Sequence, residues 1–162
     1  MFLDRSSQLY DYIKECELLG LPAYMSVHPF KKRDYVFGLE KLFFDFDCKK
    51  DLDKAWNEAR DFAIKIERFY GAKPLLVFSG CKGFHVYVWL WNTIEVRKSH
   101  EMQAKQIYKD LQKKLLKSLK YETLDRQVLG DIKRLARVPY STHEKMRARA
   151  RATHTTKKLV QT

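Results

Sequence analysis

Apolar residues recur at helical spacing in three long stretches of the chain, and shorter apolar or alternating runs lie between these stretches. The predicted helices are residues 4–20, 51–70 and 99–120. The predicted strands are residues 23–27, 35–37, 42–47, 74–78 and 84–91. In the third helix the apolar side is expected to consist of Met102, Ile107, Leu111, Leu115 and Leu119. This order of elements predicts an α/β (α+β) fold with a mixed, partly antiparallel sheet flanked by helices.

The strand at residues 42–47 reads Leu-Phe-Phe-Asp-Phe-Asp, so two acids interrupt an otherwise apolar run. Side chains alternate along a strand, which places Asp45 and Asp47 on one face and the apolar residues Leu42, Phe44 and Phe46 on the other. Adjacent carboxylates on a half-buried strand repel each other unless they meet a cation. Oxygen ligands of this kind suit Mg²⁺ or Mn²⁺. The alternative is a solvent-facing strand with two ordinary surface acids.

The turn Ser79-Gly80-Cys81-Lys82-Gly83 joins two predicted strands. Its glycines let backbone amides approach a ligand closely, and a hydroxyl and a lysine accompany them. His85 follows on the next strand, where it shares a face with Tyr87 and Trp89. The turn is therefore a candidate phosphate cradle, and the alternative is a hairpin with an incidental lysine.

Composition adds a candidate partner to this picture. The 162 residues carry a formal net charge of +12, with 45% hydrophobic and 14% aromatic residues. Such a chain folds into a packed domain, and its positive charge favours a nucleic-acid partner, although anionic membranes and acidic proteins would also be attracted. No apolar run approaches the roughly 20 residues that cross a bilayer, and the N-terminus has no signal-peptide pattern. We expect a cytoplasmic, nucleoid-associated protein without a membrane partner.

A single domain at residues 1–145 and a basic C-terminal tail at residues 146–162 are predicted from the distribution of apolar residues and charge. The three cysteines, Cys16, Cys48 and Cys81, are widely spaced and form no CxxC pair. This spacing supports neither a disulfide framework nor a structural zinc site.

A third motif lies in residues 124–143, where Asp125 is followed by an Arg-Leu-x-Arg-x-Pro-x-Ser-x-His pattern that begins at Arg134 and ends at His143. With the Asp-x-Asp strand and the Ser-Gly-x-Lys-Gly-x-His turn before it, the chain resembles the catalytic subunit of archaeo-eukaryotic primases and their primase-polymerase relatives. The ordered motifs span residues 45–143. The family's usual zinc-binding element is missing, because residues 92–124 contain no cysteine and a single histidine, His100.

The resemblance implies a role for each matching position. It implies that Asp45, Asp47 and Asp125 are the catalytic acids and the ligands of two Mg²⁺ or Mn²⁺ ions. It implies that the nucleotide-binding residues are Ser79, Gly80, Lys82, Gly83, His85, Arg137 and His143. Taken alone, His85 could be a satisfied histidine beside a sheet and Asp125 a helix cap.

The activity implied by the resemblance is that of a template-directed nucleotidyltransferase with a primase-like catalytic core. Such an enzyme makes or extends short primers on single-stranded DNA from nucleoside triphosphates by two-metal catalysis, and a large primase subunit or another replication protein is a further expected partner. One alternative is a catalytically weak accessory module that binds single-stranded nucleic acid or nucleotides. Another is a metal-dependent nuclease, which would not need the turn for a triphosphate.

Overall fold

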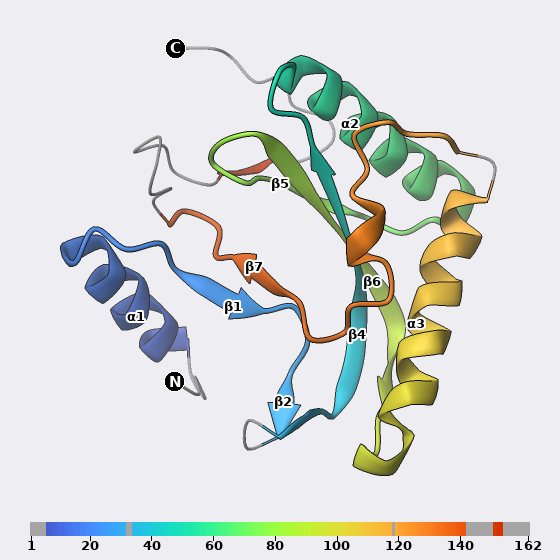
Figure 1. The fold of residues 1–162 in the computed structure, drawn as a ribbon, viewed down its shortest axis with the longest axis horizontal. Coiled ribbons are helices and arrows are strands. Elements are labelled where there is room, and N and C mark those ends of the chain that lie inside the picture. Colours follow the sequence, from blue (N-terminus) through green and yellow to red (C-terminus); the bar gives the residue numbers. More distant parts are fainter. Residues whose placement is uncertain (1–5, 32–33, 118, 142–150, 154–162) are drawn as a thin grey trace.

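The computed structural model describes residues 6–31, 34–117, 119–141 and 151–153, and it confirms the predicted α/β class (Figure 1). The α-helices are α1 (Ser6–Leu18), α2 (Leu52–Tyr70) and α3 (Glu101–Leu116), and the 3-10 helices are η1 (Lys98–His100) and η2 (Arg126–Val128). The strands are β1 (Tyr24–Ser26), β2 (Phe30–Lys31), β3 (Tyr35–Val36), β4 (Gly38–Asp47), β5 (Leu75–Phe78), β6 (Gly83–Glu95), β7 (Leu135–Arg137) and β8 (Arg151–Thr153).

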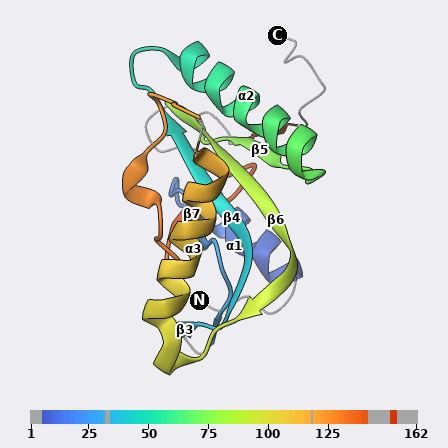
Figure 2. The ribbon, with the colours of Figure 1, turned by 90° about the vertical axis from the view of Figure 1, so that its right-hand side faces the viewer.

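The central element is a four-stranded sheet in the order β4-β6-β5-β8. Two short ribbons, β1-β7 and β2-β3, accompany it, and all the strand pairs of the described part of the chain are antiparallel. Helices α2 and α3 lie on one side of the sheet, while β1, β7 and α1 lie on the other (Figures 1 and 2). The strand β8 falls within the predicted basic tail and pairs with β5. None of the helices in the described ranges has the length and apolarity required to span a membrane.

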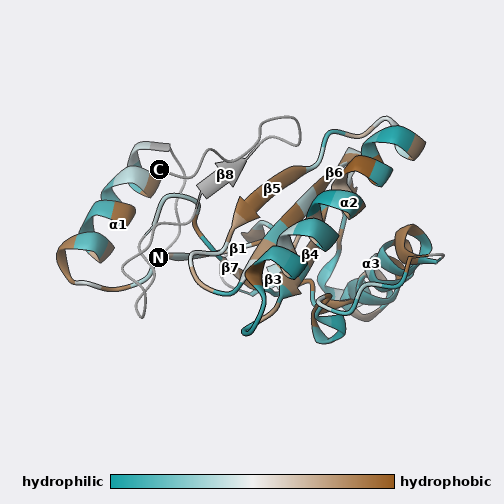
Figure 3. Cartoon of the chain, turned by 90° about the horizontal axis from the view of Figure 1, so that it is seen from above, coloured by the Kyte–Doolittle hydropathy of each residue, from teal (hydrophilic) through white to brown (hydrophobic). Residues whose placement is uncertain are grey.

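Helix α2 forms where the sequence predicts it. The Asp51 side chain caps its first turn by accepting a hydrogen bond of 2.8 Å from the Lys54 amide, and Gly71 ends it in the left-handed conformation with φ of 65°. Its apolar stripe packs on the apolar face of β4, where the rings of Phe44 and Phe62 lie 4.6 Å apart. Figure 3 shows the division between the teal outer surface of α2 and the brown stretches of β5 and β6.

The predicted apolar side of α3 is wrong in part. Met102 and Ile107 are 76% and 48% exposed, and the buried side instead contains Tyr108 and Gln112. Both of these residues use polar atoms to close the outer edge of β4: the Phe43 amide donates to Tyr108 Oη at 2.9 Å, and Gln112 Nε2 donates to the Phe43 carbonyl at 2.7 Å. Apolar periodicity misses such a face because its key contacts are hydrogen bonds.

The same edge of β4 is closed further along by residues 123–125. The Asp125 amide donates to the Asp45 carbonyl at 2.8 Å, and the Asp47 amide donates to the Thr123 carbonyl at 2.7 Å. Phe46 and Leu124 form an antiparallel bridge between these hydrogen bonds. Residues 123–125 therefore run beside β4 like a short extra strand, which brings the third predicted acid next to the first two.

Candidate active site

The three predicted acids lie on one face of neighbouring backbone segments. Asp45 and Asp47 alternate with Phe46 along β4, and Asp125 directly follows the bridge partner of Phe46. Because side chains alternate along extended backbone and directly opposed residues share a face, Asp125 lies on the Asp45 side of the sheet. The structure thus brings together acids that are about 80 residues apart in the sequence.

Asp45 is the most buried of these acids, with 5% of its surface exposed. Burial, together with the negative charges of Asp47 and Asp125, raises its pKa to about 7, against the opposing effect of the cations Arg134 and Lys82. Its Oδ1 atom is buried and has no hydrogen-bond partner in the structure. A buried carboxylate with an unsatisfied oxygen is a group that gains strongly from a bound cation.

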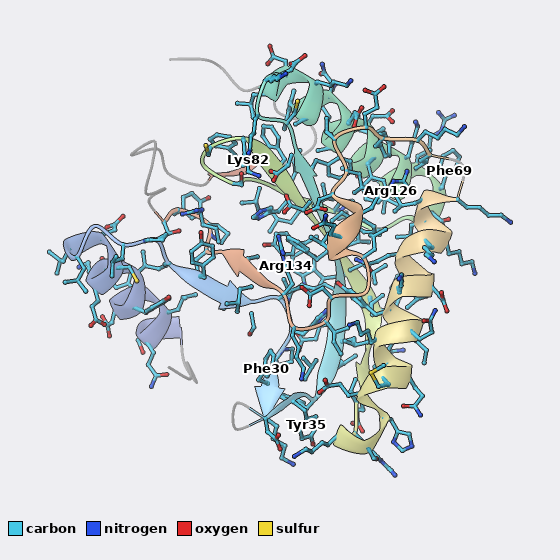
Figure 4. All side chains as sticks on the ribbon, viewed as in Figure 1. Phe30, Tyr35, Phe69, Lys82, Arg126 and Arg134 are labelled. Carbon is cyan, nitrogen blue, oxygen red and sulfur yellow. The ribbon has the colours of Figure 1, made fainter. Side chains whose placement is uncertain are left out.

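Two basic side chains of the protein face the acids. Lys82 Nζ donates to Asp47 Oδ2, and this hydrogen bond, with the charge of Asp47, raises the pKa of Lys82. Arg134 Nη2 lies 3.4 Å from Asp45 Oδ2. Figure 4 shows Lys82 and Arg134 on the side of β4 that faces β7, away from α3. The negative charges of Asp45 and Asp47 are therefore partly neutralised by Arg134 and Lys82.

His85 stands directly opposite Asp45 in the β4-β6 register. Its Nε2 lies 3.8 Å from Asp45 Oδ1, which is too long for a hydrogen bond, and its Nδ1 is buried without a partner. Burial lowers the pKa of His85 to about 4, so the ring is neutral at pH 7 and the contact is no ion pair. The ring therefore has a buried nitrogen atom, Nδ1, without a hydrogen-bond partner among the described residues.

The predicted turn forms a hairpin in which the Ser79 amide donates to the Gly83 carbonyl at 2.9 Å. Gly80 adopts φ of 93°, a conformation that favours glycine. A Cβ atom at Gly83 would collide with the Phe46 carbonyl oxygen and the Asp47 carboxylate. The second glycine is therefore required by the close approach of β6 to β4.

Replacing Gly83 by alanine is expected to destabilise the fold and to displace Asp47. The added methyl group meets backbone atoms, so a strand must move, at a cost of about 1–3 kcal/mol. Thermal or urea unfolding measures this loss, and Ser79→Ala in the same turn is the control, with an expected change within about 0.5 kcal/mol. Equal stability of the Gly83→Ala variant and the wild type would contradict the close approach.

The remaining predicted residues differ in where they lie. The Asp125 carboxylate accepts a 2.9 Å hydrogen bond from the Gln127 amide, so Asp125 caps η2 as well as facing the other acids. Arg137 is buried in β7, where its Nη2 donates to Tyr24 Oη at 2.9 Å, and its charge contributes to the lowered pKa of His85. His143 lies outside the described residues.

Carboxylate chemistry and electrostatics fit a divalent cation at this face, although the described residues contain no group of three or more His, Cys, Asp or Glu side chains already arranged around one point. Asp47 is turned toward Lys82, and Asp125 toward the η2 amide. The unpartnered Oδ1 of Asp45 supplies the independent sign that a ligand belongs here. The backbone segments that carry the three acids are already paired.

The sequence matches no protein-family model and no curated protein. Its fold, however, is similar to that of archaeo-eukaryotic primase-polymerase (AEP) domains, as the motifs predicted. The AEP domain of the primase-polymerase (PrimPol) of cyanophage S-2L is similar with a TM-score of 0.58 and 18% identity, over 96% of this chain and 71% of that chain. The polymerase domain of Mycobacterium tuberculosis ligase D, solved in complex with DNA, is similar with a TM-score of 0.54 and 17% identity, over 83% of this chain and 50% of that chain.

Arg134 is the site residue that our sequence assignment omits. It belongs to the third motif, three residues before Arg137, but only the structure shows its contact with Asp45. The signal was present in the sequence, since Arg134 and Arg137 cannot share a face of the strand in which Arg137 lies. The two side chains must therefore point in different directions, and the structure shows that the Arg134 side chain points toward Asp45.

Proposed function

We propose that the protein is a template-directed nucleotidyltransferase that makes or extends short primers on single-stranded DNA. The observation that carries this proposal is the face shared by Asp45, Asp47 and Asp125, with a buried Asp45 oxygen that lacks a partner. The primase-polymerase fold supports the same reading, because its solved relatives are a primase-polymerase and a DNA-bound polymerase domain.

In this proposal the acids hold Mg²⁺ or Mn²⁺, which would activate a primer 3′-hydroxyl and stabilise the leaving pyrophosphate. Lys82 and Arg134, released from the carboxylates, contact the triphosphate. His85 is neutral, so it acts as a hydrogen-bond donor to a phosphate oxygen rather than as a cation. Ser79, Gly80 and Gly83 shape the turn beside it, and Arg137 and His143 complete the proposed nucleotide-binding set.

The proposal also names the partners of the protein. Single-stranded DNA and nucleoside triphosphates are the proposed partners, and a large primase subunit or another replication protein is a third. The accessory-module alternative needs the binding surfaces but not the acids. The burial of Asp45 argues against that alternative, because an ionised carboxylate in this position destabilises the fold unless it binds a cation.

The proposal is tested by incubating the full chain with labelled nucleotides and Mn²⁺ or Mg²⁺ on a single-stranded template, with and without an annealed primer. We expect metal-dependent incorporation that EDTA stops. Synthesis without a primer identifies a primase, and synthesis only from a primer identifies a polymerase.

The same reaction separates the alternatives. Shortening of the template in place of nucleotide incorporation would assign the site to a nuclease. Template binding without incorporation or cleavage, under every metal condition, would overturn the enzyme and leave the accessory module.

A further inference from the structure

Strand β6 carries a line of aromatic side chains that leads away from the acids. His85, Tyr87 and Trp89 occupy alternate positions in regular register with β4 and therefore share a face, and Trp91 follows two residues later, where the β4-β6 register shifts. Their exposed fractions rise along the strand, from 7% and 8% to 49% and 93%. The rings of Tyr87 and Trp89 lie 6.3 Å apart. The line begins at the candidate site and ends in solvent.

The β1-β7 ribbon lies beside Tyr87 and Trp89. Tyr87 packs in a small apolar cluster that includes Val27, which directly follows β1, and Ala136 of β7. Trp89 and Trp91 remain open, and β6 continues along the length of the molecule (Figure 2). Two neighbouring tryptophans on one strand form an exposed apolar surface of the kind that marks a binding site.

A cavity of about 170 Å³ lies between the ribbon and Trp89. Lys41, which stands opposite Trp89 in the β4-β6 register, and Arg137 line this cavity, and its other lining residues are uncharged. Lys41 Nζ also lies 3.6 Å from Glu40. The surface next to the tryptophans therefore combines flat aromatic rings with positive charge, in a protein whose net charge is +12.

We propose that Trp89 and Trp91 form a stacking platform for bases of single-stranded nucleic acid, with Lys41 on the side of the phosphates. Every base offers a flat face to an aromatic ring, whereas a duplex keeps its bases stacked inside. Trp89 lies four residues along the strand from His85, or about 13 Å. A single-stranded nucleic acid held on this platform is therefore close enough to enter the candidate site. We identify this nucleic acid as the template, which rests on the proposed function.

The test is a binding measurement in EDTA, so that catalysis plays no part. A fluorescently labelled oligothymidylate and a duplex of the same length are titrated with wild type, Trp91→Ala, Trp91→Phe and Trp89→Ala. We expect each alanine variant to bind the single strand about tenfold more weakly, Trp91→Phe to retain most of the affinity, and duplex binding to change little. Two of the three tryptophans lie in the platform, so the single strand should also quench tryptophan fluorescence.

Phe69→Ala is the matched control, because Phe69 is a 69% exposed aromatic residue on the opposite side of the molecule from β7 (Figure 4). Wild-type affinity in both alanine variants would overturn the platform even if the enzyme incorporates nucleotides. Weakened binding in a protein that incorporates nothing would support the platform and count against the proposed function alone. Trp91 is too exposed for its replacement to unfold the chain, so a loss of affinity in Trp91→Ala reports on the surface itself.

Discussion

Asparagine in place of Asp45 is expected to lower metal-dependent nucleotide incorporation by on the order of a thousandfold. The substitution keeps the shape of the side chain and removes the charge that a divalent cation needs. Asp47→Asn should have an effect of the same order, because the two acids lie one strand repeat apart on the same face. The measurement is the initial rate of incorporation on a primed single-stranded template at saturating Mn²⁺.

Asp110→Asn is the matched control for this loss. Asp110 is exposed on α3, where it accepts a hydrogen bond from Gln106. The control should keep the wild-type rate. If Asp45→Asn retained activity within about tenfold of the wild type, the acid face could not be the catalytic centre.

Asp45→Asn is also expected to stabilise the metal-free protein at alkaline pH. The folded-state pKa of Asp45 is about 7, above the ordinary value of 3.8, so the folded chain holds the proton more tightly than the unfolded chain does. Wild-type stability therefore falls as the pH rises from about 4 through about 7, whereas asparagine has no charge to bury. The difference at about pH 8 is on the order of 2–4 kcal/mol in favour of Asp45→Asn.

Urea unfolding in EDTA across this pH range measures the difference, with Asp110→Asn again as the control. Added Mn²⁺ should then raise the midpoint of the wild type and leave that of Asp45→Asn nearly unchanged, because a ligand that binds only the folded state stabilises it. Parallel pH profiles for wild type and Asp45→Asn would show that Asp45 carries no unfavourable buried charge.

The sequence was sufficient to predict the parts of the site that depend on local pattern. Alternation along β4 placed Asp45 and Asp47 together, and the capped, striped segment at residues 51–70 predicted α2 almost to the residue. The ordered motifs predicted the fold. Such features are encoded by residues close to one another in the chain, for which strand and helix periodicity are reliable guides.

The rest depends on contacts between distant segments. The pairing of Tyr24 with Arg137 between β1 and β7 joins residues more than a hundred positions apart, and nothing in either segment specifies it. Burial of Gln112 follows from the hydrogen bonds that it makes with the β4 edge and with the Gly130 amide. Likewise, the neutral state of His85 and the contact between Arg134 and Asp45 arise only when the sheet is assembled.

Strand β4, which carries Asp45 and Asp47, is hydrogen-bonded along both of its edges. β6 bonds to one side of this strand, and Tyr108, Gln112 and residues 123–125 bond to the other. Its apolar side chains meanwhile pack against α2 as the centre of the core. The backbone that carries Asp45 and Asp47 therefore belongs to the part of the chain whose amides exchange with solvent only when the whole domain opens. The acidic residues and the folding core lie on two sides of one strand, so this site should lose its geometry only together with the fold.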